Sequence, residues 1–303
     1  MRPELIRASE LLQRQTPEAV EKAIGLMQST VYSFSMKVCG HPEDAEDTMQ
    51  DVLFRSLGHL QKLKSPEVLA AWLYTVTRNR CWRMRRKPAN TRARTLSLDE
   101  LMPNDAELGR LLEDSAAGPE DHAVEAEQHA LLQDAVLRVP PQLRIVLVLH
   151  DMEELDTDLV AQILGLKTGT VRVRLHRARL AVRKQMSMLL EKAKSEKRRQ
   201  KFVRRKSAAG RRRPEACRTL FANLSEYLDG RVEPRTCDEM RLHIENCPSC
   251  VVFLRDLRAA IDRCRSIETP CDPAVASRLR AVLTREYLRM FNISTGNKRA
   301  YRM

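Results

Sequence analysis

Three side chains in the last third of the sequence have the types and spacing of a metal site. His243, Cys247 and Cys250 form the pattern His-x3-Cys-x2-Cys. Residues four apart lie on one face of a helix, so the imidazole of His243 and the thiolate of Cys247 can converge. A turn of the chain at Pro248 can then place Cys250 beside them. One nitrogen and two sulfur ligands suit a zinc ion whose tetrahedral coordination is completed by a fourth ligand.

The fourth ligand is expected to be Cys217, which opens a helix that ends near Gly230, before a second helix that starts near Pro234. Cys237 competes for the same role. A set of buried structural thiols is the alternative to a metal site. Domains this small rarely hold together on a hydrophobic core alone, so a bound metal would contribute folding free energy on the order of 10 kcal/mol. The predicted zinc ligands are Cys217, His243, Cys247 and Cys250.

A second group of residues offers positive charge to nucleic acid. Residues 156–184 contain two short helical patterns around the corner Gly165-Leu166-Lys167, and the second helix carries five arginines. Val171, Leu175 and Ala178 fall on one stripe suited to packing, which leaves a basic face for the major groove of DNA. An ordinary solvated basic helix is the alternative. The residues expected to contact DNA are Thr170, Arg172, Val173, Arg174, His176, Arg177 and Arg179.

An acidic helix face lies nearer the start of the chain. Gly40 ends one helix and Pro42 begins another, whose core stripe contains Ala45, Met49, Val52 and Leu53. The opposite face carries Asp47, Gln50, Asp51 and Phe54, and acidic residues around a phenylalanine suggest a docking surface. The alternative is that Phe54 fills a second core between helices.

A further helix over about residues 67–86 becomes steadily more basic. Tyr74, Arg78 and Arg85 share a face, with Trp82 nearby, and aromatic rings beside arginines can stack on unpaired bases. Trp72 lies among apolar residues and is expected in the core. Trp82 fits a core position and a base contact equally well.

Composition and charge divide the chain into three folded parts. The 303 residues include only ten glycines and few aromatic residues, which favours helices. Residues 191–213 carry a net charge of +10, most of the total of +13, and residues 96–127 carry −9. Both segments contain helix breakers and are interpreted as linkers. Neither a membrane span nor a secretion signal is evident, so we expect a cytoplasmic protein whose eight cysteines serve metal or redox chemistry.

Three stretches together resemble one family. DAEDTMQDVLFRSL, AAWLYTVTRNRCWRMRR and VPPQLRIVLVLHDMEELDTDLVAQILGLKTGTVRVRLHRAR are similar to a bacterial extracytoplasmic-function (ECF) sigma factor of the sigma-70 family, over roughly residues 17–188. In that family the first block grips the clamp helices of the RNA polymerase β′ subunit and opens the −10 element. The second block is a helix-turn-helix that contacts the β flap and reads the −35 element.

The resemblance implies roles for individual residues. It assigns the acidic face of Asp47, Gln50, Asp51 and Phe54 to the polymerase, and residues 172–179 to the −35 element. The loop 61–67 and the helix after it would recognise the single-stranded −10 element. The −10 residues are predicted to be Tyr74, Arg78, Asn79, Trp82 and Arg85. Three positions depart from the family pattern, because His41 replaces an Asp or Asn cap, Glu154 a usual Gly, and Val173 a residue that is often polar.

The metal-binding part resembles the zinc-binding anti-sigma domain over about residues 214–265. Such a domain fused behind sigma domains suggests regulation within one chain. It would pack against the polymerase-binding or DNA-reading surfaces until a signal altered the metal or the thiols. Cys237, Cys264 and Cys271 are further thiols that could take part in that exchange or could be idle.

We therefore predict an all-α chain in which two helical sigma domains, the second a helix-turn-helix, are joined by an acidic linker and followed by a small zinc-binding helical domain. The expected function is promoter-specific transcription initiation with core RNA polymerase and promoter DNA, without catalysis, a membrane or a small-molecule substrate. The alternative is a zinc-containing helix-turn-helix regulator that does not replace a sigma subunit.

The amphipathic stretch 274–290 could pack on the zinc domain or bind a partner. The predicted boundaries are 17–88 and 128–190 for the sigma domains, 89–127 and 191–213 for the linkers, 214–265 for the zinc domain and 266–303 for the tail.

Overall fold

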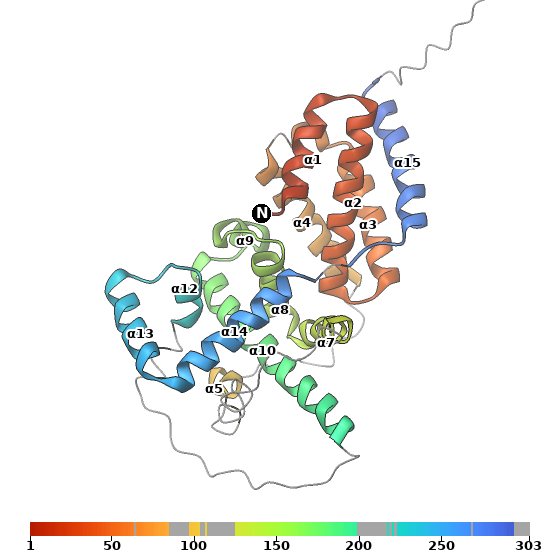
Figure 1. Cartoon of the computed structure of the whole chain (residues 1–303). Coiled ribbons are helices and arrows are strands. Elements are labelled where there is room, and N and C mark those ends of the chain that lie inside the picture. Colours follow the sequence, from red (N-terminus) through yellow and green to blue (C-terminus); the bar gives the residue numbers. More distant parts are fainter. Residues whose placement is uncertain are drawn as a thin grey trace, which may run out of the picture. The chain divides into compact units, whose positions relative to one another are not determined.

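The computed structural model is all-helical over the residues it describes, which confirms the predicted fold class (Figure 1). These residues are 1–63, 65–84, 97–103, 107, 125–198, 217, 220, 223–267 and 269–293. The chain forms two compact units. The first contains Met1–Thr91, Glu153–Leu166 and Glu268–Met303, and the second contains Arg92–Met152 and Lys167–Ile267.

Helix α2 (Pro17–Cys39) is the centre of the first unit. It packs against α1 (Pro3–Arg14), α3 (Pro42–Leu57), α4 (Pro66–Met84) and α15 (Pro273–Met290). A short 3₁₀ turn, Leu60–Lys62, precedes α4, and α9 (Thr157–Leu164) packs on α4. The core of this unit is therefore built mainly around the long, apolar α2, which is buried along most of its length.

Local signals in the sequence explain where these helices begin and end. The Thr16 hydroxyl accepts a hydrogen bond from the Ala19 amide at 3.3 Å, which caps the start of α2. Gly40 ends α2 with a φ of 83°, a left-handed conformation that suits glycine, and Pro42 opens α3. The predicted boundary between the two helices is confirmed.

The predicted core stripe of α3 is also confirmed. Ala45, Met49, Val52 and Leu53 are all buried, while the opposite side of the helix faces outward. The helical period of 3.6 residues alone was sufficient to separate these two faces.

The second unit is arranged around α10 (Thr168–Arg198). This helix packs against α7 (Glu125–Arg138), α8 (Pro141–Leu147), α12 (Leu224–Leu228) and α14 (Pro248–Arg265). The unit also contains α5 (Leu98–Leu101), a π-helical turn at Val148–Met152, and α13 (Pro234–Asn246). Val171, Leu175 and Ala178 of α10 are buried, as the stripe predicted.

Parts of both predicted linkers are helical. Helix α10 continues through residues 191–198, where glutamates and lysines three or four apart favour a helix. Helix α5 starts at a capping box in which the Ser97 side chain and the Glu100 side chain each accept a bond from the other residue's backbone amide. Residues 89–96, 104–106, 108–124 and 199–213 of the predicted linkers lie outside the described residues.

The amphipathic stretch near the C-terminus forms α15 and belongs to the first unit, where it packs on α2 and α3 (Figure 1). Asp272 caps its first turn, and Leu283 and Tyr287 are fully buried. The Gln28 side-chain amide donates to the carbonyl of Ala276 at 3.1 Å. The sequence left open whether this stretch packs on the zinc domain or binds a partner; the helix packs on α2 and α3 of the first unit.

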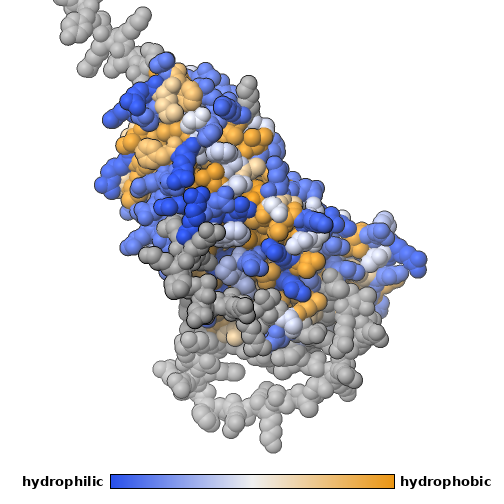
Figure 2. Space-filling model, turned by 180° about the vertical axis from the view of Figure 1, so that it is seen from behind, coloured by the Kyte–Doolittle hydropathy of each residue, from blue (hydrophilic) through white to orange (hydrophobic). Residues whose placement is uncertain are grey.

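The exposed apolar residues are dispersed. Figure 2 shows hydrophobic residues interspersed with hydrophilic ones on the face it displays. Large apolar side chains that are exposed include Ile6, Phe54, Trp82 and Val173. None of the described helices combines the length and the hydropathy that crossing a bilayer requires.

Gly165 provides a test of the turn between α9 and α10. It caps α9 with a φ of 65°, and no atom would obstruct an added Cβ, so Gly165→Ala should cost about 1 kcal/mol of unfolding free energy through backbone strain alone. Gly169 also has open space around it but lies in the first turn of α10, so Gly169→Ala should instead stabilise by roughly 0.5–1 kcal/mol. Urea unfolding of both variants measures the difference, and equal effects would contradict this conformation of the turn.

Candidate metal centre and nucleic-acid interface

The structure brings the four predicted metal ligands together. Cys217, His243, Cys247 and Cys250 each place a ligand atom within 4.8 Å of the others. His243 Nε2 lies 3.4 Å from the Sγ atoms of both Cys217 and Cys250, and these two sulfurs are 3.7 Å apart. Tetrahedral ligands about 2.3 Å (sulfur) and about 2.0–2.1 Å (nitrogen) from a zinc ion lie roughly 3.5 to 3.8 Å from one another, and the separations among Cys217, His243 and Cys250 are close to these values.

Two helix ends and a bend position these ligands. His243 lies in the last turn of α13, and α13 ends at Asn246. Cys247 is therefore not a helical residue four places after His243, as predicted, but lies in extended backbone where Pro248 starts α14. Cys250 follows in the first turn of α14.

The thiolate form of Cys250 is disfavoured in this cluster. Burial and the neighbouring Cys247 and Cys217 raise the pKa of the Cys250 thiol. A divalent cation offsets this repulsion by binding the deprotonated form. The competing ligand Cys237 lies in α13 outside the cluster, and Cys264 is buried in α14 outside it as well.

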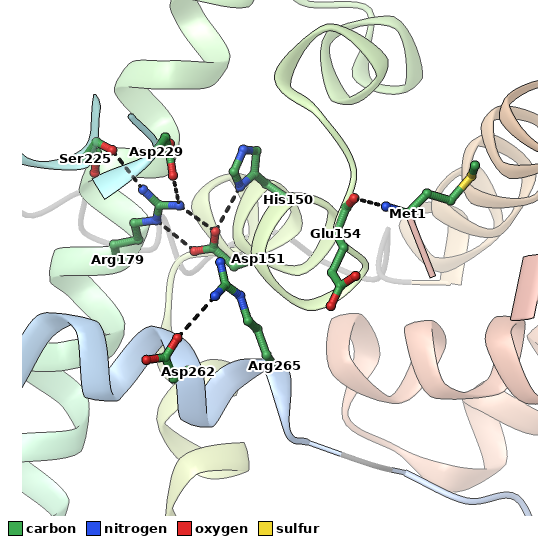
Figure 3. A network of polar contacts seen from close by, with 9 residues as sticks. All are labelled: Met1, His150, Asp151, Glu154, Arg179, Ser225, Asp229, Asp262 and Arg265. Carbon is green, nitrogen blue, oxygen red and sulfur yellow. Dashed lines mark hydrogen bonds and ion pairs between the residues drawn. The ribbon is translucent and has the colours of Figure 1, made fainter. Parts of the chain in front are cut away.

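Helix α12, which follows Cys217, holds the middle of α10 through polar contacts (Figure 3). Arg179 on α10 is 1% exposed, and its guanidinium pairs with Asp151 at 2.6 Å and with Asp229 at 2.7 Å. It also donates to the carbonyl of Ser225 at 3.3 Å. His176 Nδ1 lies 3.1 Å from the Ser225 hydroxyl.

Burial and hydrogen bonds together set the charge of these groups. Burial would raise the pKa of Asp151, but hydrogen bonds from Arg179 and His150 outweigh it and hold that pKa at about 2. Burial, with the nearby Arg179 and Arg177, lowers the pKa of His176 to about 4. At neutral pH, Asp151 is therefore ionised and His176 is neutral.

Helix α14 holds the next turns of α10. Arg183 is also 1% exposed, pairs with Asp256 at 2.6 Å and lies over the ring of Phe253, 4.9 Å from its centroid. Within α14, Arg265 pairs with Asp262 at its exposed end (Figure 3).

The residues predicted to read DNA on α10 fall into two groups. Thr170, Arg172 and Val173 are exposed, and Arg174 and Arg177 are half-buried. His176 and Arg179 are buried, so the expectation that they lie on or beside the exposed face is wrong for this structure. The physical reason is that Asp151, Ser225 and Asp229 supply the polar partners that make their burial favourable.

The acidic face of α3 is accessible. Asp47, Gln50 and Phe54 are exposed, with Phe54 at 45%. Asp51 is half-buried and pairs with Arg55 and Arg80. Phe54 therefore does not fill a second core in this structure.

The basic face of α4 is partly covered. Tyr74 is 1% exposed, which corrects the expectation that it shares an open face with Arg78. Its ring packs on Phe34 and its hydroxyl donates to Glu153 at 2.8 Å. Arg78 is half-buried, with its guanidinium 5.3 Å from the centroid of the Trp82 ring, and Trp82 is 43% exposed.

The remaining predicted residues of this face are Asn79 and Arg85, and Trp72 of the same helix was expected in the core. Asn79 is half-buried and accepts hydrogen bonds from Arg78. Trp72 is half-buried and donates to the Ser56 hydroxyl at 3.2 Å. Arg85 lies outside the described residues.

Sequence reasoning missed the acidic partners Asp151, Glu153 and Asp229. A carboxylate that pairs with a distant arginine leaves no local pattern. One signal was available for Arg179, which is four residues after Leu175 and three before Val182 and so borders the buried stripe of its own helix.

Comparison with known proteins agrees with this organisation. Residues 24–91 match the family described as "Sigma-70 region 2", and residues 129–182 match "Sigma-70, region 4". Residues 217–250 match a family described as "Putative zinc-finger", which spans the four clustered ligands.

Curated relatives are sigma factors. The chain is 27% identical over 172 residues to the ECF RNA polymerase sigma factor SigW of Bacillus subtilis (strain 168), covering 56% of this chain and 89% of the relative. It is 32% identical over 148 residues to the RNA polymerase sigma-E factor of Streptomyces antibioticus, covering 48% of this chain and 72% of that relative.

A solved structure of the sigma factor RpoE in complex with the anti-sigma factor NepR from Bartonella quintana is 20% identical, with a TM-score of 0.35, and covers 55% of this chain and 92% of that chain. The two sigma-70 regions occur in the family order, with a zinc-finger match behind them. The chain belongs to the sigma-70 family and is an ECF RNA polymerase sigma factor with a C-terminal zinc-finger region.

Proposed function

We propose that this sigma factor binds the β′ clamp helices of core RNA polymerase through the face of α3 that carries Asp47, Gln50, Asp51 and Phe54. The observation that carries the proposal is the exposure of Phe54 beside acidic residues, on a helix whose other side is fully buried. A large apolar side chain left open within a polar surface is typical of a binding anchor. Members of this family are not enzymes, and the proposed role needs no catalytic group.

Promoter DNA is the second proposed partner. Arg172 and Val173 at the exposed start of α10 would read base edges of the −35 element, with Thr170, Arg174 and Arg177 beside them. On α4, Trp82 and Arg78 would contact the single-stranded −10 element. The alternative, a zinc-containing helix-turn-helix regulator acting without polymerase, gives no reason for the apolar anchor on α3.

The Cys217, His243, Cys247 and Cys250 cluster is proposed to bind zinc. Three sulfurs and one imidazole are a common donor set of structural zinc sites, and their spacing fits tetrahedral coordination. The metal would join α13 and α14 to the chain that leads into α12.

The zinc-binding part is further proposed to regulate the sigma factor in cis, through α10. Asp229 and Asp256 hold two arginines of that helix, and α12 and α14 pack along it. Zinc would favour this arrangement by ordering the segment before α12, and loss of zinc would release it.

Polymerase binding can be tested at Phe54. Phe54→Ala should weaken binding to purified core RNA polymerase by about tenfold, as expected for an anchor residue, with little change in thermal stability. Ile6→Ala on α1 is the matched control, because Ile6 is an apolar side chain of similar exposure (39%) away from this face. Equal affinities of the two variants, measured by fluorescence titration, would count against the α3 face.

Zinc binding can be tested at Cys250. Purified protein should contain about one zinc per chain by atomic emission, and Cys250→Ser should lose most of it and unfold at a lower temperature. Cys237→Ser should retain the metal, because Cys237 lies outside the cluster. Retention of zinc by Cys250→Ser, or its loss from Cys237→Ser, would show that the ligand set is wrong.

Regulation in cis can be tested at Asp229. Asp229→Asn removes one charge partner of Arg179 but leaves Asp151 in place, so the fold should survive while promoter-specific transcription with core enzyme rises roughly threefold or more. Asp238→Asn, which changes an exposed pair with Arg241 on α13, is the control. Unchanged transcription from Asp229→Asn, and from the full-length chain with and without chelator or oxidant, would refute regulation by this domain.

A further inference from the structure

Glu153 is a fully buried carboxylate in the first unit. Its side chain is 0% exposed, and it lies in the short segment before α9. Oε1 is 2.8 Å from Lys37 Nζ, and Oε2 is 3.0 Å from Arg2 Nε and 2.8 Å from the Tyr74 hydroxyl, which donates to it. One carboxylate thus receives two cations and a hydroxyl.

The three donors come from three different parts of the first unit. Arg2 directly precedes α1, Lys37 lies in the last turn of α2, and Tyr74 is in the middle of α4. Glu153 comes from a segment more than 70 residues away along the chain. We call the donors Arg2, Lys37 and Tyr74 the anion site.

The anion site requires a negatively charged occupant. Lys37 is 1% exposed, and a buried ammonium that loses its charge partner is strongly destabilising. The Met1 nitrogen lies nearby and donates to the backbone carbonyl of Glu154 (Figure 3). An ammonium, a guanidinium and a hydroxyl are also donors that proteins use for phosphate oxygens.

The site continues into the face of α4 that is proposed to contact DNA. One turn after Tyr74, Arg78 donates to the backbone carbonyl of Ile163 on α9, and its guanidinium lies against the exposed ring of Trp82. Residues 153–166 therefore supply an oxygen atom to each of two positions one turn apart on α4, Tyr74 and Arg78.

We propose that the anion site binds a backbone phosphate of single-stranded DNA, and that Glu153 occupies it as an intramolecular substitute for that phosphate. The inference deepens the proposed function, because the strand concerned is the one that α4 is proposed to recognise. Binding of DNA at this site and docking of residues 153–166 exclude one another. DNA that enters the site therefore displaces α9 from α4.

The first test compares two adjacent glutamates in the full-length protein. Fluorescence anisotropy with a fluorescein-labelled single-stranded DNA of roughly 16 nucleotides and mixed sequence measures affinity without polymerase. Glu153→Gln should bind this probe about five- to tenfold more tightly than the unsubstituted chain. Glu154→Gln removes the same charge from an exposed side chain and should change the affinity little.

A second substitution separates displacement from a general charge effect. In the Glu153→Gln background, Lys37→Gln should weaken binding of the probe and reduce the slope of log affinity against log salt by about 0.7, the value for one phosphate contact on a single strand. Equal binding by Glu153→Gln and Glu154→Gln, or no effect of Lys37→Gln in that background, would overturn the proposal.

The unsubstituted protein supplies a measurement that does not depend on how the variants fold. Hydrogen exchange of the amides of α9 should accelerate when the single-stranded probe is added, because the helix leaves α4. Unchanged or slower exchange would mean that Glu153 has a structural role only. Failure of this proposal would leave polymerase binding through Phe54 unaffected, since no polymerase enters these experiments.

Discussion

A charged side chain buried in this protein needs opposite charge within contact distance, and this constraint determines how distant parts of the chain are held together. The cost of an unpaired buried ion is several kcal/mol, comparable with the whole stability of many domains. Arg179 is held by Asp151 and Asp229, and Glu153 is held by Lys37 and Arg2. In each case the partners come from segments far apart in sequence, so each ion fixes which segments pack together.

The features that could be predicted from the sequence are those with a local pattern. The metal ligands were predictable because His243, Cys247 and Cys250 fall within one short pattern, and zinc chemistry limits which residue types can serve. The faces of α3 were predictable because Ala45 and Met49 repeat with the helical period. Both patterns are local, and a local pattern can be recognised in the sequence without knowledge of the fold.

The buried ions were not predictable for the opposite reason. Arg179 lies among arginines on a basic helix, and its residue type is the same whether it contacts a phosphate or Asp229. Tyr74 likewise has a ring suited to base stacking and a hydroxyl suited to a buried carboxylate. Only the packing of α4 with the segment around Glu153 distinguishes these uses, and that packing depends on contacts across more than 70 residues of chain.

The pattern of exposure also bears on the step at which regulation in cis would act. Phe54 on α3 and Val173 on α10 are accessible, whereas Tyr74 is covered and Arg179 is held by the part that follows the zinc ligand Cys217. Within the second unit, Asp229 and Asp256 hold the middle of α10, which follows the exposed residues proposed to read the −35 element. Regulation in cis through these contacts would therefore act on the engagement of duplex DNA, because they restrain the helix that is proposed to enter the major groove.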